Sequence, residues 1–107
     1  MATSHGEVER QLERAFRTGV RRCERLGYHP AYFIRMLDEH GAVGAARQLL
    51  AASAVSEGFT RLWALGHLEL TVEAIVLDER FVSLFTPTER RVAQSRLEKL
   101  GYRPTPA

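Results

Sequence analysis

The sequence predicts an all-α fold, a compact orthogonal bundle of five to six short helices. Apolar residues recur at three- and four-residue spacings, and no two convincing strands are present to pair with each other. Glycine follows four of the periodic stretches, at Gly27, Gly41, Gly66 and Gly101. Many helices end on a left-handed glycine at this position. A chain of 107 residues has the usual size of one domain, so we expect a single helical domain over 1–107 with an ordered core of about 6–102.

The periodic stretches predict helices over residues 6–26, 30–40, 42–52, 57–65, 71–79 and 87–100. The clearest start is "TPTE" at 86–89, where Thr86 is the cap, Pro87 the first helical residue, and Glu89 the third residue after the cap. The segment "LELTV" at 68–72 alternates like a strand but also fits two apolar helical stripes. Because no partner strand exists, we interpret the region as a central helix, buried on two sides and capped by Thr71.

The helix predicted at 57–65 carries the single tryptophan of the chain. Phe59, Leu62, Trp63 and Gly66 follow helical spacing and so lie on one stripe. We interpret Trp63 as a core anchor rather than a stacking platform. The helices at 57–65 and 71–79 are expected to form the core, with the first and last helices covering it.

A hexapeptide occurs twice, as "RLGYHP" at 25–30 and "KLGYRP" at 99–104. Each copy closes a basic amphipathic helix with a glycine cap and then a proline, which cannot continue a helix. The residues between the copies show no matching period. We therefore interpret the pair as two uses of one helix-stop device rather than as a duplication.

Composition excludes several classes of protein. A hydrophobic content of 45% with 26% charged residues is typical of a soluble globular protein rather than a disordered one. No apolar run approaches the roughly 18 residues that span a bilayer, and the first residues do not resemble a signal peptide. Cys23 is the only cysteine, which excludes an internal disulfide and a thiolate zinc cluster. We expect a cytoplasmic protein that binds no cofactor and no membrane.

Arginine is concentrated on the first predicted helix. The formal net charge of +2 is small for a nucleic-acid binder, and a GC-rich genome can by itself raise arginine content, so position matters more than abundance. At about 100° per residue, five arginines fall within a sector of roughly 80°. They are Arg10, Arg14, Arg17, Arg21 and Arg25. Two interpretations stay open: a solvated face with ion pairs to Glu7, Glu13 and Glu24, or a surface that binds nucleic acid.

The last predicted helix is also basic. It carries Arg90, Arg91, Arg96 and Lys99, and Arg103 follows its cap. These residues would extend the arginine row of the first helix if the two ends of the chain pack together.

Three stretches carry a family resemblance. "GYHPAYFIRMLDEHGAVGAARQLL", "EGFTRLWALGHLELTVEAIVL" and "FVSLFTPTERRVAQSRLEKLGY", together about residues 26–102, resemble a small uncharacterised bacterial helical domain. That domain occurs alone or attached to larger proteins, some of them of restriction or nuclease type. The resemblance implies an all-helical fold and a link to DNA-handling or phage-defence systems. It implies no catalytic or binding residues.

Motifs of the common enzyme classes are absent from the sequence. There is no P-loop, no HExxH, no GxSxG and no EF-hand loop. Two polar groups remain as candidates for metal or acid–base chemistry: Asp38, Glu39 and His40, and a second set of His67, Glu69 and Glu73. Consecutive helical residues diverge by about 100°, so the first set cannot point at one metal unaided, whereas Glu69 and Glu73 share a helical face. A site joining the two sets depends on the tertiary fold.

The leading functional expectation is a non-catalytic binding or adaptor module with weak, sequence-independent affinity for nucleic acid through the arginine row. One alternative is a protein-interaction or oligomerisation module that binds no nucleic acid. Another is a small enzyme that uses the histidine and carboxylate groups. A basic face free of neutralising acids favours nucleic acid, an exposed apolar patch favours a protein partner, and a closed polar pocket favours an enzyme.

Overall fold

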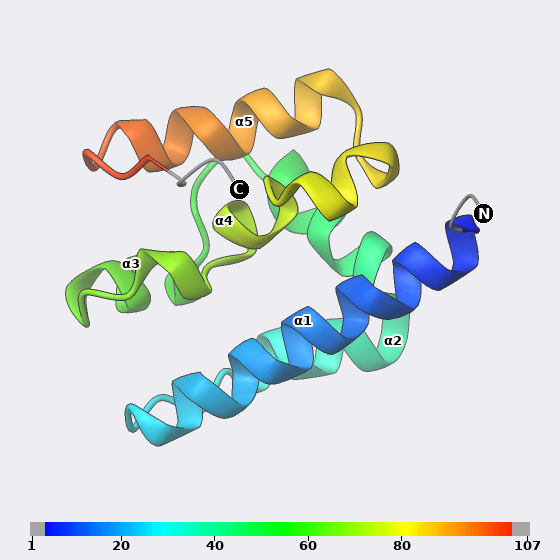
Figure 1. Ribbon diagram of the computed structural model, residues 1–107. Helices are drawn as coiled ribbons and strands as arrows, with labels where there is room; N and C mark the ends of the chain where they lie inside the picture. Colours follow the sequence, from blue (N-terminus) through cyan, green and yellow to red (C-terminus); the bar gives the residue numbers. More distant parts are fainter. Residues whose placement is uncertain (1–3, 104–107) are drawn as a thin grey trace.

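Helices account for all the regular structure in the computed structural model, which describes residues 4–103 (Figure 1). In chain order they are α1 (His5–Arg25), α2 (Ala31–Ala51), α3 (Glu57–Ala64), the 3₁₀ helix η1 (Leu68–Leu70), α4 (Val72–Val76), the 3₁₀ helix η2 (Glu79–Leu84) and α5 (Pro87–Glu98). No strand occurs in this range, so the predicted all-α fold is confirmed. The Cα radius of gyration is 13.0 Å, close to the ~13 Å typical of a compact 100-residue domain.

Side-chain caps begin four of the α-helices. The hydroxyls of Ser4, Ser56, Thr71 and Thr86 each accept a hydrogen bond from a backbone N–H in the first turn of α1, α3, α4 and α5. At α5 the bond is returned, because the Glu89 carboxylate accepts from the Thr86 N–H at 2.8 Å. This capping box and the Thr71 cap were both predicted, since capping depends on residues close in the sequence.

Three helices end with the same pair of hydrogen bonds. In the first bond, the backbone N–H of Tyr28, His67 or Tyr102 donates to the carbonyl five residues before it, at 2.8–3.0 Å. In the second, the N–H of the preceding glycine, which has a positive φ, donates to the carbonyl three residues before that glycine. This arrangement is the Schellman motif. Both hexapeptide copies therefore end their helices by one mechanism, as predicted; Pro104, the last residue of the second copy, lies outside the described residues.

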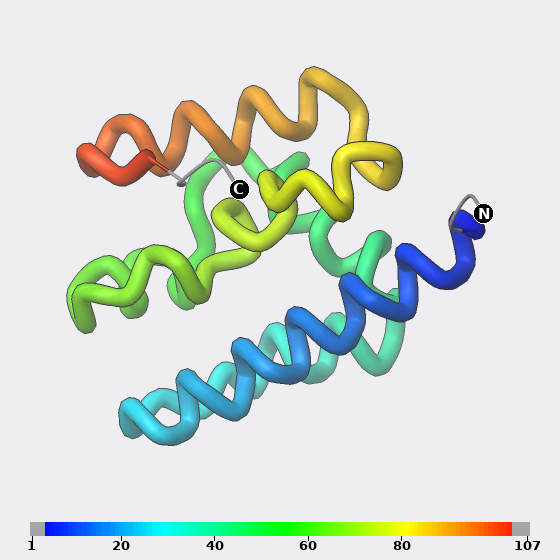
Figure 2. Tube along the Cα trace, in the orientation of Figure 1, coloured from blue at the N-terminus to red at the C-terminus, as the bar shows by residue number. Residues whose placement is uncertain are grey.

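Helix α2 turns a corner at Gly41. This residue has φ 74° and ψ 175°, which separates the helix into residues 31–40 and 42–51, the two helices that the sequence predicted. The first half packs against α1, where the rings of Phe16 and Phe33 meet edge to face with centroids 5.2 Å apart. The second half reaches α5, where Arg47 forms a 3.2 Å ion pair with Glu89. Figure 2 traces the resulting change of direction.

The largest hydrophobic cluster joins α1, both halves of α2, α4, η2 with Phe85 directly after it, and α5. Its fully buried members are Leu12, Phe16, Ala45, Ala46, Val76, Phe81 and Ala93. The central position predicted for residues 71–79 is confirmed, because α4 contacts α1, α2 and α5. The core role predicted for residues 57–65 is wrong, since α3 contributes only Phe59 and Leu62, each to a small satellite cluster.

Trp63 is not a core anchor, so that prediction is also wrong. Its side chain is 51% exposed, whereas Phe59 and Leu62 on the same helix are buried. Helix α3 has eight residues and packs against η1 near the edge of the molecule. Position 63 lies about 100° around the helix from position 62, which places it at the margin of the narrow buried stripe.

The helices are arranged in layers. In Figure 1, α1 and the first half of α2 form one side of the molecule, α5 forms the opposite side, and α4 lies between them. No helix within residues 4–103 combines the length and the apolar composition that spanning a bilayer requires.

Candidate functional site

The arginine row lies on the outer face of α1. The opposite face of this helix is buried against the core through Val8, Leu12, Phe16, Gly19, Val20 and Cys23. This packing directs the row toward solvent, and Arg10, Arg14, Arg21 and Arg25 are exposed. Arg17, at the centre of the row, is half-buried.

Arg17 is held by two carboxylates. Its guanidinium donates to Asp38 of α2 at 2.8 Å and lies 3.5 Å from Glu13 on its own helix. The hydrogen bond to Asp38 raises the pKa of Arg17. The predicted site residue Arg17 therefore ties α1 to α2, and its charge is locally neutralised.

The other four arginines of the row have no such partner. Within residues 4–103, no carboxylate oxygen lies within 4.0 Å of the guanidinium of Arg10, Arg14, Arg21 or Arg25. Arg21 makes a 3.1 Å hydrogen bond to the Thr18 hydroxyl, which is neutral. The row thus presents four uncompensated positive charges along α1.

A hollow beside the row adds two further arginines. It has a volume of about 580 Å³ and is lined by Arg14 and Arg22 of α1 and by Arg80 of η2. Arg22 lies 3.7 Å from Glu69, and Arg80 donates to both oxygens of Asp78. The Arg80 bonds hold the pKa of Asp78 below its usual value.

We call the combined area the α1 basic surface: Arg10, Arg14, Arg21, Arg22, Arg25 and Arg80. Arg22 was not among the predicted site residues, although it follows Arg21 directly and could have been added on that ground. Arg80 is placed there only by the fold, because η2 packs against α1.

Helix α5 does not extend this surface, because the condition for it, packing of the first and last helices against each other, is not met. It lies on the opposite side of the molecule from α1 (Figure 1). Two of its arginines also bind the protein itself: Arg90 donates to the Val82 carbonyl at 2.8 Å, and Arg96, whose side chain is 10% exposed, pairs with Glu73.

Arg96 forms a buried ion pair with Glu73. Its Nη1 donates to Oε2 of Glu73 at 3.0 Å, and the side chains are 10% and 3% exposed. Arg96 also donates to the carbonyls of Leu49 and Ala52 at 3.0 and 2.6 Å. Burial raises the pKa of Glu73, and Arg96 opposes that rise. The pair joins α4, α5 and the end of α2, which is a structural role.

The predicted sharing of a face by Glu69 and Glu73 is wrong. The extended backbone of Thr71, at φ −71° and ψ 155°, interrupts the helix between them. Glu69 is instead hydrogen-bonded to the His67 ring at 2.8 Å. Partial burial raises the pKa of Glu69, but the bonds to His67 and to its own backbone amide lower it by more, so the pKa is below its usual value.

The two histidine–carboxylate sets do not come together. His40 has Glu39 at 3.8 Å as its nearest carboxylate partner. Among residues 4–103, no group of three or more His, Cys, Asp or Glu side chains is placed to hold a metal ion.

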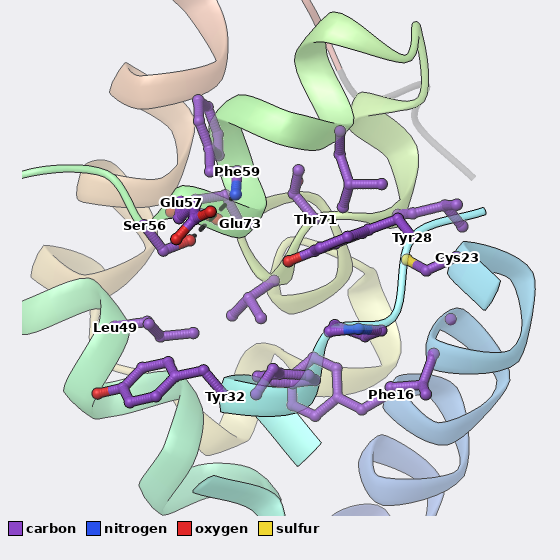
Figure 3. Close-up of a pocket in the computed structure, with 18 of the residues that line it drawn as sticks. Phe16, Cys23, Tyr28, Tyr32, Leu49, Ser56, Glu57, Phe59, Thr71 and Glu73 are labelled. Carbon is purple, nitrogen blue, oxygen red and sulfur yellow. Dashed lines mark hydrogen bonds between the residues drawn. The ribbon is translucent and has the colours of Figure 1, made fainter. Parts of the chain in front are cut away.

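A second hollow, of about 600 Å³, opens between α1, the start of α2, the segment that leads into α3, and α4 (Figure 3). We call it the apolar cavity. Aromatic rings of Phe16, Tyr28, Tyr32, Phe33 and Phe59 form much of its wall. The Cys23 thiol also lines it, and burial raises the pKa of that thiol, which keeps it protonated. This cavity was not predicted, because it is assembled from distant parts of the chain.

Tyr28 extends across the apolar cavity. In Figure 3 its hydroxyl points inward, toward the side where Ser56 and Glu57 lie. A Cβ atom at position 58 would lie 3.0 Å from this oxygen, so a larger residue there would require the Tyr28 hydroxyl to shift by a few tenths of an ångström. Burial raises the pKa of Tyr28, so its phenol remains a hydrogen-bond donor.

Comparisons of the chain with protein-family models, with curated proteins and with solved structures find no match. Function is therefore inferred from the geometry of the α1 basic surface and the apolar cavity.

Proposed function

We propose that the protein is a non-catalytic binding module that contacts the phosphate backbone of nucleic acid through the α1 basic surface. The observation that carries this proposal is the row of four arginines without carboxylate partners on one exposed face of α1. Guanidinium groups bind phosphate oxygens through a fork of donors. The resemblance to a domain found beside restriction-type proteins favours a cytoplasmic role in a DNA-linked or phage-defence system.

The dimensions of the row fit a nucleic-acid duplex. From Arg10 to Arg25 the helix rises roughly 22 Å at about 1.5 Å per residue. A duplex presents several phosphates over that length, since it carries about one charge per 1.7 Å. Phosphate contacts carry no sequence information, so binding through the arginines is expected to be weak and sequence-independent.

The non-catalytic part of the proposal is supported by the pairing of titratable side chains. Glu73 is bound by Arg96, Glu69 by His67, and His29 by Glu24 at 2.7 Å. A general acid or base has to reach a substrate, whereas these groups bind one another.

Charge reversal tests the proposal. Arg14→Glu combined with Arg21→Glu should abolish binding of a fluorescently labelled duplex, measured by anisotropy at low salt. Arg91→Glu on α5, combined with Lys99→Glu at its C-cap, changes the net charge equally on the opposite side of the molecule and should preserve binding. Equal loss in both double variants would show that net charge rather than this surface is responsible, and no binding by the unmodified protein would refute the proposal.

The exposed Trp63 favours a second candidate, a protein contact. The indole is 51% exposed, and Leu65, the C-cap residue of the same helix, is 37% exposed. Tryptophan is enriched among the residues that dominate protein–protein binding energy. Size-exclusion chromatography and pull-downs from the native cell, with the unmodified protein and Trp63→Ser, test this. A partner or dimer that is lost only in Trp63→Ser would support it.

A further inference from the structure

We propose that the apolar cavity is a binding site for an uncharged aromatic small molecule. This function goes beyond the nucleic-acid contact, because no arginine of the α1 basic surface lines the cavity, although the cavity and the hollow beside the arginine row share the wall residues Gly19, Leu70 and Ile75. The three properties that support it are the size of the cavity, the charge of its wall and the position of the Tyr28 hydroxyl.

Size and wall composition fit a small ligand. The volume of about 600 Å³ falls within the range of roughly 300–1,000 Å³ found for small-molecule sites, which are mostly apolar and aromatic. The rings of Phe16, Tyr28, Phe33 and Phe59 come from four separate segments and surround the space. Aromatic rings favour a flat aromatic guest through stacked and edge-to-face contacts.

The charges of the wall select against anions. No arginine or lysine lines the cavity, whereas the carboxylates of Glu57 and Glu73 both do. Glu73 is already paired with Arg96, the lining His29 is hydrogen-bonded to Glu24, and the Arg61 guanidinium is stacked on the Tyr28 ring at 5.2 Å from its centroid. The wall itself therefore offers no arginine or lysine to a negatively charged ligand. Placing an unpaired charge in an apolar site is costly, so fatty acids and organic phosphates are disfavoured.

Tyr28 supplies the polar contact. Its hydroxyl points into the cavity, and within residues 4–103 it makes no hydrogen bond to another protein group. The nearby Thr71 hydroxyl already donates to the Leu68 carbonyl and accepts from the Ala74 N–H. The Tyr28 hydroxyl is not cut off from solvent, since no buried side-chain polar atom of residues 4–103 lacks a hydrogen-bond partner, so an acceptor on the ligand would replace water there. A ligand with an apolar body and one hydrogen-bond acceptor facing Tyr28 would contact the aromatic wall and accept a hydrogen bond from this hydroxyl.

Two fluorescent probes that differ by one charged group test the charge selectivity. N-phenyl-naphthylamine is uncharged and aromatic, and anilinonaphthalene sulfonate is the same scaffold with an added sulfonate. We expect saturable one-to-one binding of the uncharged probe, and binding of the sulfonate weaker by about tenfold or more. Equal affinities, or no saturable binding of the uncharged probe, would overturn the proposal.

Amide NMR spectra of the unmodified protein locate the probe without any substitution. We expect shifts at cavity residues such as Cys23, Phe59 and Thr71, and none at Arg10 or at Gln94 on α5. Shifts confined to the exposed Trp63 would indicate surface adsorption and would contradict a cavity site.

Two exposed valines provide a matched pair of variants. Val55 lines the cavity and is 39% exposed, whereas Val82 does not line it and is 43% exposed. Val55→Trp, and independently Ala54→Trp at the neighbouring wall position, should lower the probe's affinity by about tenfold or more, and Val82→Trp should leave it unchanged. Thermal melting of each variant checks the fold. Unchanged affinity in folded Val55→Trp and Ala54→Trp, or equal loss in Val82→Trp, would count against the cavity.

Discussion

Arg96 of α5 and Glu73 of α4 form an ion pair of 3.0 Å in which both side chains are almost completely removed from solvent. The guanidinium also binds two backbone carbonyls at and beyond the end of α2. One arginine thus connects three separate parts of the chain. Removing it would leave a buried carboxylate and two carbonyls without their partner.

Arg96→Met is therefore expected to destabilise the protein by about 3–5 kcal/mol, because an uncompensated buried charge remains. Glu73→Gln should cost less, since the amide oxygen still accepts from Arg96 and the remaining guanidinium keeps its two carbonyl partners. Urea denaturation measures both. Arg91→Met, on the exposed face of α5, should stay within about 0.5 kcal/mol of the unmodified protein. A harmless Arg96→Met would show that the pair has no structural role.

The cost of Arg96→Met should also depend on pH. Burial raises the pKa of Glu73, and without Arg96 it should rise further. An acid whose folded-state pKa is raised stabilises the fold below its unfolded pKa of about 4.3, and that contribution is lost as the pH rises through the folded pKa. The deficit of the variant should therefore be smaller at about pH 4 than at pH 7. Thermal melting at both values checks this, with Arg91→Met as control; an equal deficit at both would argue against a buried charged carboxylate.

Nucleic-acid binding by the α1 basic surface should depend steeply on salt. If about three phosphates are neutralised, the logarithm of the affinity should fall with the logarithm of salt at a slope of about −2.7. Arg14→Glu alone should reduce the size of that slope by about one contact, roughly 0.9. Anisotropy titrations of duplex DNA and RNA across a salt series measure it. If Arg14→Glu has the same slope as the unmodified protein, Arg14 does not contact a phosphate.

The positions of Trp63 and Phe59 predict opposite sensitivities to truncation. Phe59 is 4% exposed, so Phe59→Ala should cost about 3–5 kcal/mol. Trp63→Ala should cost much less, about 1 kcal/mol or below, because half of the indole is already in water. Circular dichroism follows unfolding in both, since Trp63→Ala removes the only tryptophan. A large loss of stability in Trp63→Ala would show that the indole is part of the core.

Most helix ends could be predicted because their signals are local, but the helix predicted over 71–79 ends at Val76 and the 3₁₀ helix η2 was not predicted. The caps at Thr71 and Thr86 and the glycine stops depend on residues at most five positions apart, and the structure contains each of them. The exposure of the arginine row could likewise be predicted, because one helix buries its apolar face.

Other features depend on which helices meet, and the sequence does not encode this in a short pattern. The sequence spacing of Arg96 is that of a surface residue, and only the packing of α4 against α5 places the Glu73 carboxylate beside it. Trp63 follows the same spacing as its buried neighbours, but α3 is too short and too peripheral to cover it. Arg80 and the apolar cavity are likewise products of tertiary packing.

The corner at Gly41 has a consequence for how a short chain encloses its interior. A straight helix of 21 residues would form a rod of roughly 31 Å at about 1.5 Å per residue. The molecule measures 40 × 27 × 26 Å, and α1, also of 21 residues, already forms such a rod along it. A straight α2 packed beside α1 would carry residues 42–51 away from α5. Residues with a side chain rarely adopt φ 74°. The closure of the bundle thus depends on an amino acid whose contribution is the absence of a side chain.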